Sequence, residues 1–208
     1  MPFAPARPSR PARRALLATG LALGALPWLS ACDGAPSAAS FKGMDLTGAD
    51  YGKALSLDDP TGRARSLADF RGQVVMVFFG FTQCPDVCPT ALARAVQVKQ
   101  GLGADGARLQ VLFVSVDPER DTGPVLAEYT KAFDPTFLAL RGDAARTEAA
   151  AKEFKVFYRR VPTGNSYTMD HTALSYLIDP QGRLRVAVRH NQPAEEIVAD
   201  VRQLLAGR

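Results

Sequence analysis

The chain has few cysteine and histidine side chains, which bind the softer metals and, in the case of cysteine, carry redox chemistry. Its 208 residues include three cysteines and two histidines. It also lacks an uninterrupted run of the ~18 to 20 apolar residues that a membrane-spanning helix needs, because the apolar stretch at residues 15–29 is broken by Gly20, Gly24 and Pro27. Any site for a softer metal or for thiol redox chemistry must therefore be built from very few residues, and the length favours one folded domain.

Acidic residues are absent before Cys32, whereas four arginines stand there, at positions 7, 10, 13 and 14. Without these four, the 25 basic residues of the chain become 21, which equals its 21 acidic residues. The pI of about 9.1 therefore reflects the N-terminal segment, and the rest of the chain is neutral. This distribution excludes a basic nucleic-acid-binding surface as the reason for the charge, and we predict no nucleic-acid partner.

The same N-terminal segment reads as an export signal. An arginine-rich start is followed by an apolar run and by small residues before Cys32. Residues 29–32, Leu-Ser-Ala-Cys, resemble a bacterial lipoprotein box, which implies a signal peptide at 1–31 and a lipid on Cys32. Asp33 resembles a signal for retention at the inner membrane. We expect a lipid anchor at the periplasmic face of the inner membrane in the bacterial cell envelope, with an uncleaved anchor helix as the alternative.

Residues 33–50 are rich in Ala, Ser, Gly and Pro and predict a flexible tether before a domain at 51–208. Within that domain, apolar runs and turn residues predict strands at 54–57, 73–79, 109–116, 137–140, 172–178 and 184–188 and helices at 90–102, 123–133, 143–154 and 193–205. A helical turn is expected at 66–70 and extended chain at 156–159. This order predicts an α/β, thioredoxin-like fold with a central mixed sheet and helices on both faces. The long connection before residue 172 would be an insertion.

Cys84 and Cys88 form a C-x-x-x-C pair directly after the strongest predicted strand. In an exported protein, two cysteines that close so short a loop are more plausible as a redox or metal-binding pair than as a structural disulfide, because a short loop gains little stability from a disulfide. Since Pro89 suits the first turn of a helix, we expect the helix to begin there, with residues 84–88 as a turn capping it. Thiolates are stabilised at a helix N-terminus. A stabilised thiolate is useful both in a redox-active disulfide pair and in a metal site, so this feature does not separate the two.

His171 is the candidate third ligand. In a thioredoxin-like fold, the loop before the terminal hairpin faces the cysteine turn. Two thiolates and one imidazole suit copper, as Cu(I) or Cu(II), whereas a structural zinc site usually has a fourth firm ligand. Asp86 and Asp170 flank these ligands and would either orient His171 or act as turn and capping residues. Met169 has a soft sulfur atom, but we do not include it among the predicted metal ligands. His190 is expected to be solvent-exposed.

Three segments resemble the SCO/SenC family, in the family's order: residues 80–90, 114–122 and 170–182. The resemblance implies a thioredoxin-like fold and a membrane-tethered copper-binding protein that assists assembly of the binuclear copper site of cytochrome c oxidase. It also implies that Cys84, Cys88 and His171 are the copper ligands. Asp117 and Asp121 lie in the second segment, and we expect them to be structural or to face a partner.

Two functions remain open from the sequence. The first is a copper chaperone whose partners are the copper-site subunit of cytochrome c oxidase, a periplasmic copper donor and the membrane. The second is a thiol–disulfide reductase that uses Cys84 and Cys88 to keep the acceptor's cysteines reduced. A peroxiredoxin-like peroxidase is disfavoured, because Val77 and Phe81 stand where that motif has proline and threonine before Cys84.

Overall fold

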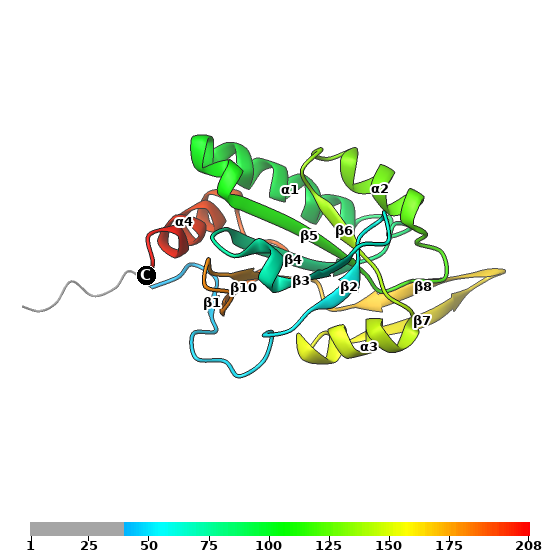
Figure 1. Ribbon diagram of the computed structural model, residues 1–208. Coiled ribbons are helices and arrows are strands. Elements are labelled where there is room, and N and C mark those ends of the chain that lie inside the picture. Colours follow the sequence, from blue (N-terminus) through cyan, green and yellow to red (C-terminus); the bar gives the residue numbers. More distant parts are fainter. Residues whose placement is uncertain (1–39) are drawn as a thin grey trace, which may run out of the picture. The chain divides into compact units, whose positions relative to one another are not determined.

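A six-stranded mixed sheet runs through residues 40–208, the part of the chain that the computed structural model describes (Figure 1). Its strand order is β1 (Met44–Asp45), β10 (Leu184–Arg189), β9 (Leu174–Ile178), β4 (Val74–Gly80), β5 (Leu109–Ser115) and β6 (Leu138–Leu140). β4, β5 and β6 are parallel, and the other neighbours are antiparallel. The predicted signal peptide and the predicted lipidation at Cys32 lie outside the described residues.

Helices cover both faces of this sheet, as predicted. They are α1 (Val87–Leu102), α2 (Gly123–Lys131), α3 (Ala144–Glu153) and α4 (Ala194–Leu205), with short 3-10 turns at Leu67–Phe70 and Gly103–Arg108. In Figure 1, α1 and α4 lie along one face and α3 lies on the other. Among residues 40–208, no helix has both the length and the apolarity needed to cross a membrane.

The composition of strand β4 explains why helices must pack on both faces of the six-stranded sheet. All seven of its residues are buried, and successive side chains point to opposite faces. Met76 and Phe78 lie against Ala95 of α1. The Phe79 ring instead contacts Phe154, just after α3, at 5.4 Å between centroids. A strand that is apolar on both faces belongs in the centre of a sheet, and β4 lies between β5 and β9.

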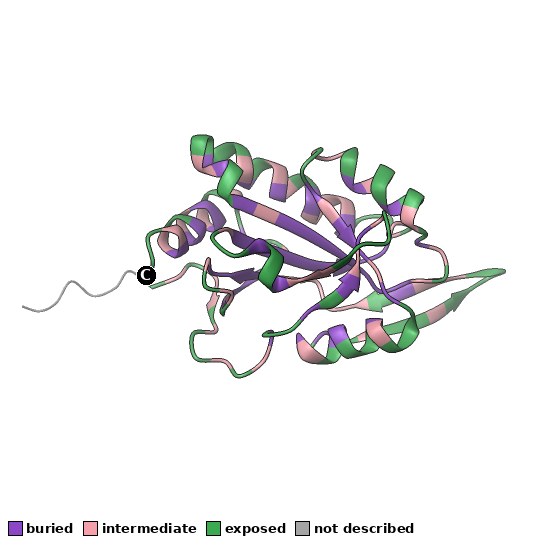
Figure 2. Cartoon of the chain, in the orientation of Figure 1, coloured by how far each residue is buried: buried purple, intermediate pink, exposed green. Residues whose placement is uncertain are grey.

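Two antiparallel hairpins stand outside the main sheet: β2 (Ser56–Asp58) with β3 (Ala64–Ser66), and β7 (Tyr158–Thr163) with β8 (Ser166–His171). The second hairpin is new relative to the sequence prediction, which expected only extended chain at 156–159 and then an insertion. β7 is largely exposed, and in β8 only Met169 is buried (Figure 2), so neither strand has the apolar alternation that marks a half-buried strand. The Gly164-Asn165 pair at its tip, with Gly164 at φ 55°, is the turn signal that could have revealed it.

The predicted tether at 33–50 ends earlier than expected. Met44 pairs with Ala187 as the edge strand β1. The carboxylate of Asp200 in α4 accepts the backbone N–H groups of Lys42 and Gly43 at 2.7 and 2.8 Å. Residues 42–45 therefore belong to the folded domain. Composition alone did not show this, because the anchor is a buried carboxylate more than 150 residues away.

Asp200→Ala tests this anchor. It leaves two backbone donors without their charged acceptor, and hydrogen bonds to charged groups contribute about 1.5–3 kcal/mol each. We expect the free energy of unfolding in urea to fall by about 3 kcal/mol, given incomplete additivity, and the Met44 amide to exchange faster. Glu195→Ala, on the exposed start of the same helix, is the control and should cost at most about 1 kcal/mol. Equal losses in the two variants would contradict the anchor.

Candidate metal centre

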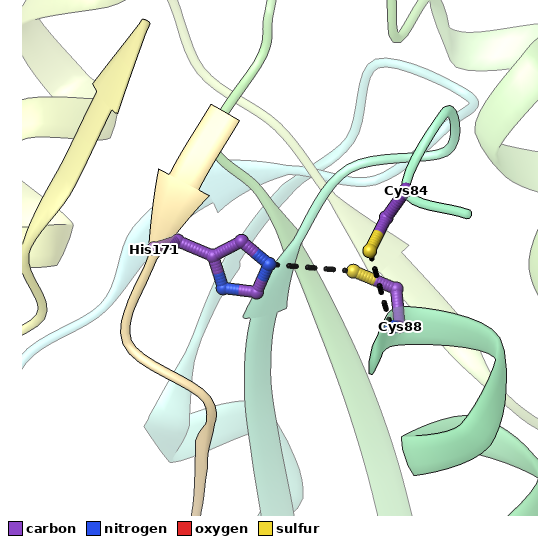
Figure 3. A group of neighbouring side chains, drawn as sticks. All are labelled: Cys84, Cys88 and His171. Atoms are coloured by element: carbon purple, nitrogen blue, oxygen red, sulfur yellow. Dashed lines mark hydrogen bonds between the residues drawn. The ribbon is translucent and has the colours of Figure 1, made fainter. Parts of the chain in front are cut away.

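Three side chains from two distant parts of the chain converge at one end of β4 (Figure 3). Cys84 lies in the loop after β4, Cys88 in the first turn of α1, and His171 at the end of β8. Their ligand atoms all lie within 4.8 Å of one another, and Cys88 Sγ is 3.5 Å from His171 Nε2. A metal bonded to two thiolates at ~2.3 Å spans up to about 4.6 Å. Small side-chain shifts would therefore close all three residues around one ion.

Gly80, the last residue of β4, makes room for this group. A Cβ atom at Gly80 would lie 2.7 Å from Cys88 Sγ, closer than any real side-chain contact. Cys88 is fully buried, so its sulfur cannot move aside into solvent. The glycine that ends the strand is therefore required by the close approach of the second thiol.

Helix α1 begins two residues earlier than predicted, at Val87 rather than Pro89. The first four N–H groups of a helix have no partner within it, so a proline in the first turn costs no hydrogen bond. Cys88 is consequently helical, and its own N–H points at Cys84 Sγ, 3.4 Å away. The predicted capping turn is therefore shorter than expected and ends at Asp86, and the sulfur of Cys84 accepts the N–H of Cys88 in the first turn of the helix.

The two thiols differ in protonation. The pKa of Cys84 is lowered from its ordinary value, mainly by the hydrogen bond from the Cys88 thiol, with further help from the Cys88 N–H, while burial opposes the lowering. The pKa of Cys88 is raised by the same hydrogen bond and by burial. Cys84 is also the half-buried member of the pair, whereas Cys88 is buried. Without a metal, Cys84 is therefore the thiolate and Cys88 its proton donor.

The imidazole of His171 is held in one orientation. Its Nδ1 lies 3.1 Å from the carbonyl oxygen of Thr172, and since a carbonyl can only accept, Nδ1 carries the proton. Nε2 then presents a lone pair towards the thiols, as metal binding requires. The rings of Phe78 and Phe81 meet the imidazole edge-on, with centroids 5.9 and 6.0 Å away.

Neither flanking aspartate is hydrogen-bonded to His171; a turn or capping role fits the N-cap position of Asp86 but not Asp170, which lies within strand β8. Asp86 precedes α1, and its carboxylate accepts the hydroxyl of Thr90 at 3.3 Å. Asp170 forms an exposed ion pair with Arg159 at 2.9 Å. The orienting group is the backbone carbonyl of Thr172, which a sequence motif cannot reveal because every residue has one.

Asp121 holds the loop that leads to the cysteines. It is completely buried and accepts the hydroxyls of Thr82 and Ser115, each at 2.6 Å, and the Thr82 N–H. Burial raises the pKa of Asp121, while these donors oppose the rise. Asp117 is buried as well and accepts the Tyr167 hydroxyl at 2.9 Å. Of the two expectations for this pair of aspartates, the structural one matches their burial.

Met169 and His190 lie outside the group. Met169 is buried and lines a cavity with Val116 and Tyr167. His190 is half-buried rather than exposed, so the prediction of a solvent-exposed side chain is wrong. Its backbone carbonyl accepts a hydrogen bond from Arg94, which packs α1 over this end of β10.

The asymmetry of the thiols predicts the order of alkylation in the reduced, metal-free protein. Cys84 should react with iodoacetamide before Cys88, at a rate that stays nearly constant between pH 8 and pH 6. An ordinary thiol, with a pKa near 8.5, slows about tenfold per pH unit over this range. Mass spectrometry of timed samples of the chain carrying Cys32→Ser measures the order, and adding Cys84→Ser should leave one slow thiol, Cys88. A tenfold loss per unit at Cys84 would contradict the thiolate assignment.

Comparisons with known proteins agree with this fold. The family model described as SCO1/SenC matches residues 44–206. The bovine mitochondrial protein SCO2 homolog is 40% identical over 156 residues, covering 73% of this chain and 59% of its own length. A Rickettsia prowazekii SCO2-like protein is 38% identical over 135 residues, 64% of this chain and 66% of its own.

Among solved structures, Bradyrhizobium japonicum ScoI with copper bound is 38% identical. It has a TM-score of 0.68 and covers 74% of this chain and 99% of its own. Thus the chain spans about three fifths of the bovine relative and nearly all of the solved bacterial domain. The match of most of the chain to the family model, together with these identities, shows that this protein belongs to the SCO1/SenC family.

Proposed function

We propose that this protein is a copper chaperone that binds copper through Cys84, Cys88 and His171. One observation carries the proposal: three metal-ligating atoms from two distant segments lie within 4.8 Å of one another. Thiolate sulfur is the ligand that Cu(I) prefers, and a site with two thiolates and one imidazole also accommodates Cu(II). The solved relative with copper bound supports copper as the cargo.

Delivery would proceed by ligand exchange at this site. Three ligands leave a copper ion with an open position, and the half-buried Cys84 lies on the accessible side of the pair. A thiolate or imidazole of the acceptor could bind there before the donor ligands leave. The family resemblance names the acceptor as the copper-site subunit of cytochrome c oxidase, with a periplasmic copper donor supplying the ion.

A thiol–disulfide reductase is the second candidate, and the asymmetric thiols favour it. The accessible Cys84 thiolate is the sulfur that could attack an acceptor disulfide, and Cys88 would then resolve the mixed disulfide. At the end of the reaction, the acceptor's cysteines would be reduced, and Cys84 and Cys88 would be joined in a disulfide. This reaction needs no imidazole ligand, so His171 separates the two functions.

Membrane attachment is the remaining part of the proposal. The sequence Leu-Ser-Ala-Cys at 29–32 supports a lipid on Cys32, which would hold the domain at the periplasmic face of the inner membrane. A tether from residue 33 to about residue 41 would then join the lipid to the folded domain.

Anaerobic titration with Cu(I) against a chromophoric chelator tests the chaperone, with Cys32→Ser present so that only two thiols are counted. We expect one copper per chain and none after the pair is oxidised. His171→Ala should weaken the affinity roughly 100-fold, equivalent to about 3 kcal/mol. His190→Ala, at the other histidine, is the matched control and should change nothing. Absence of binding by the reduced protein would overturn the chaperone and leave the reductase.

Cys32→Ser tests the anchor separately. The unchanged protein expressed in a bacterium should incorporate labelled palmitate and sediment with membranes, and the variant should lose the label. If the variant stays in the membrane fraction without a label, an uncleaved N-terminal helix is the anchor. Labelling that persists without Cys32 would contradict lipidation at this residue.

A further inference from the structure

Arg120 connects the two halves of the metal centre. One half is the loop that carries Cys84, and the other is strand β8, which ends at His171. Arg120 Nη1 donates to the side-chain oxygen of Gln83 at 3.0 Å and to the backbone carbonyl of Tyr167 at 2.8 Å. Gln83 directly precedes Cys84, and Tyr167 lies in the same strand as His171. One nitrogen atom therefore bridges the two segments whose spacing defines the site.

The guanidinium of Arg120 is itself held in place from three sides. Its Nε donates to the carboxylate of Asp117, which is 3% exposed. Its plane lies over the Tyr167 ring, 3.6 Å from the centroid, and 5.8 Å from the Phe81 ring, which in turn meets His171. Asp117 also accepts the Tyr167 hydroxyl. Each member of the set Asp117, Arg120 and Tyr167 thus contacts the other two. These contacts fix the position of the Arg120 guanidinium.

We propose that Arg120 is a positioning residue for copper binding. By bridging Gln83 and Tyr167, Arg120 sets the distance between the cysteine loop and His171. This inference rests on the proposed function of the site. A lysine cannot replace it, because one ammonium cannot reach Asp117, Gln83 and the Tyr167 carbonyl while stacking on an aromatic face. Loss of the bridge would leave each ligand intact but allow the two halves to move apart.

Arg160 offers a matched control on the opposite face of the same ring. Its guanidinium lies 3.5 Å from the Tyr167 centroid and pairs with Glu119 at 2.7 Å. Both side chains of that pair are at least half exposed, and the contacts of Arg160 do not include the cysteine loop. Arg160→Lys therefore perturbs the same hairpin and the same aromatic stack without touching the bridge.

The test compares Arg120→Lys, Gln83→Ala and Arg160→Lys in the full chain carrying Cys32→Ser. Variants that move groups supporting metal ligands typically lower metal affinity 10- to 100-fold. We expect a Cu(I) affinity loss in this range for Arg120→Lys, a smaller loss for Gln83→Ala, and none for Arg160→Lys. The thiolate-to-Cu(II) charge-transfer bands should shift in Arg120→Lys only.

A measurement without copper keeps the inference separate from the proposed function. In the reduced, metal-free protein, the Cys84 amide bonds to the Phe81 carbonyl, and its hydrogen exchange should speed up in Arg120→Lys and Gln83→Ala but not in Arg160→Lys. If the unchanged chain binds no copper, the proposed function fails and this exchange pattern alone decides about the bridge. Equal effects of Arg120→Lys and Arg160→Lys, in affinity or in exchange, would overturn the positioning role.

Discussion

The close packing of Cys88 against Gly80 is the constraint on which the rest of the site depends. Because β4 is buried on both faces, its end cannot shift, and the missing side chain at Gly80 is the space that the Cys88 sulfur occupies. The packing brings the first turn of α1 against the strand. The free N–H of Cys88 then meets Cys84, and the sulfur that accepts it is the one that solvent can reach.

The two halves of the centre are held by different kinds of interaction. The cysteine half belongs to the apolar core, where burial supplies most of the stability. The histidine half belongs to the β7–β8 hairpin, whose Tyr167 is held to the rest of the domain by the guanidinium of Arg120 and by the buried carboxylate of Asp117. Polar and cation–π contacts are directional. They can therefore set the position of His171 in addition to the packing of Met169 in the core.

This division is consistent with a site that must bind a metal and also release it. A closed structural metal site has ligands on every side and contributes to folding. Here one sulfur is buried, while the other sulfur and the imidazole are half-buried. The protonation of the thiols follows from the same layout. The buried Cys88 stays protonated, and its S–H donates a hydrogen bond to the Cys84 sulfur. The accessible sulfur of Cys84 is therefore the reactive one in both candidate functions.

The sequence by itself determined the α/β order, the central position of β4, the cysteine pair and the one histidine near it, because these depend on local hydrophobic runs and on scarce residue types. It did not reveal the β7–β8 hairpin, the early start of α1, the docking of residues 42–45, or the bridge made by Arg120. The docking of residues 42–45 depends on Asp200 and the Arg120 bridge on Tyr167, both distant in sequence, and the orientation of His171 depends on the main-chain carbonyl of Thr172. Only the tertiary structure decided them, because hydrogen bonds of this kind leave no periodicity along the chain.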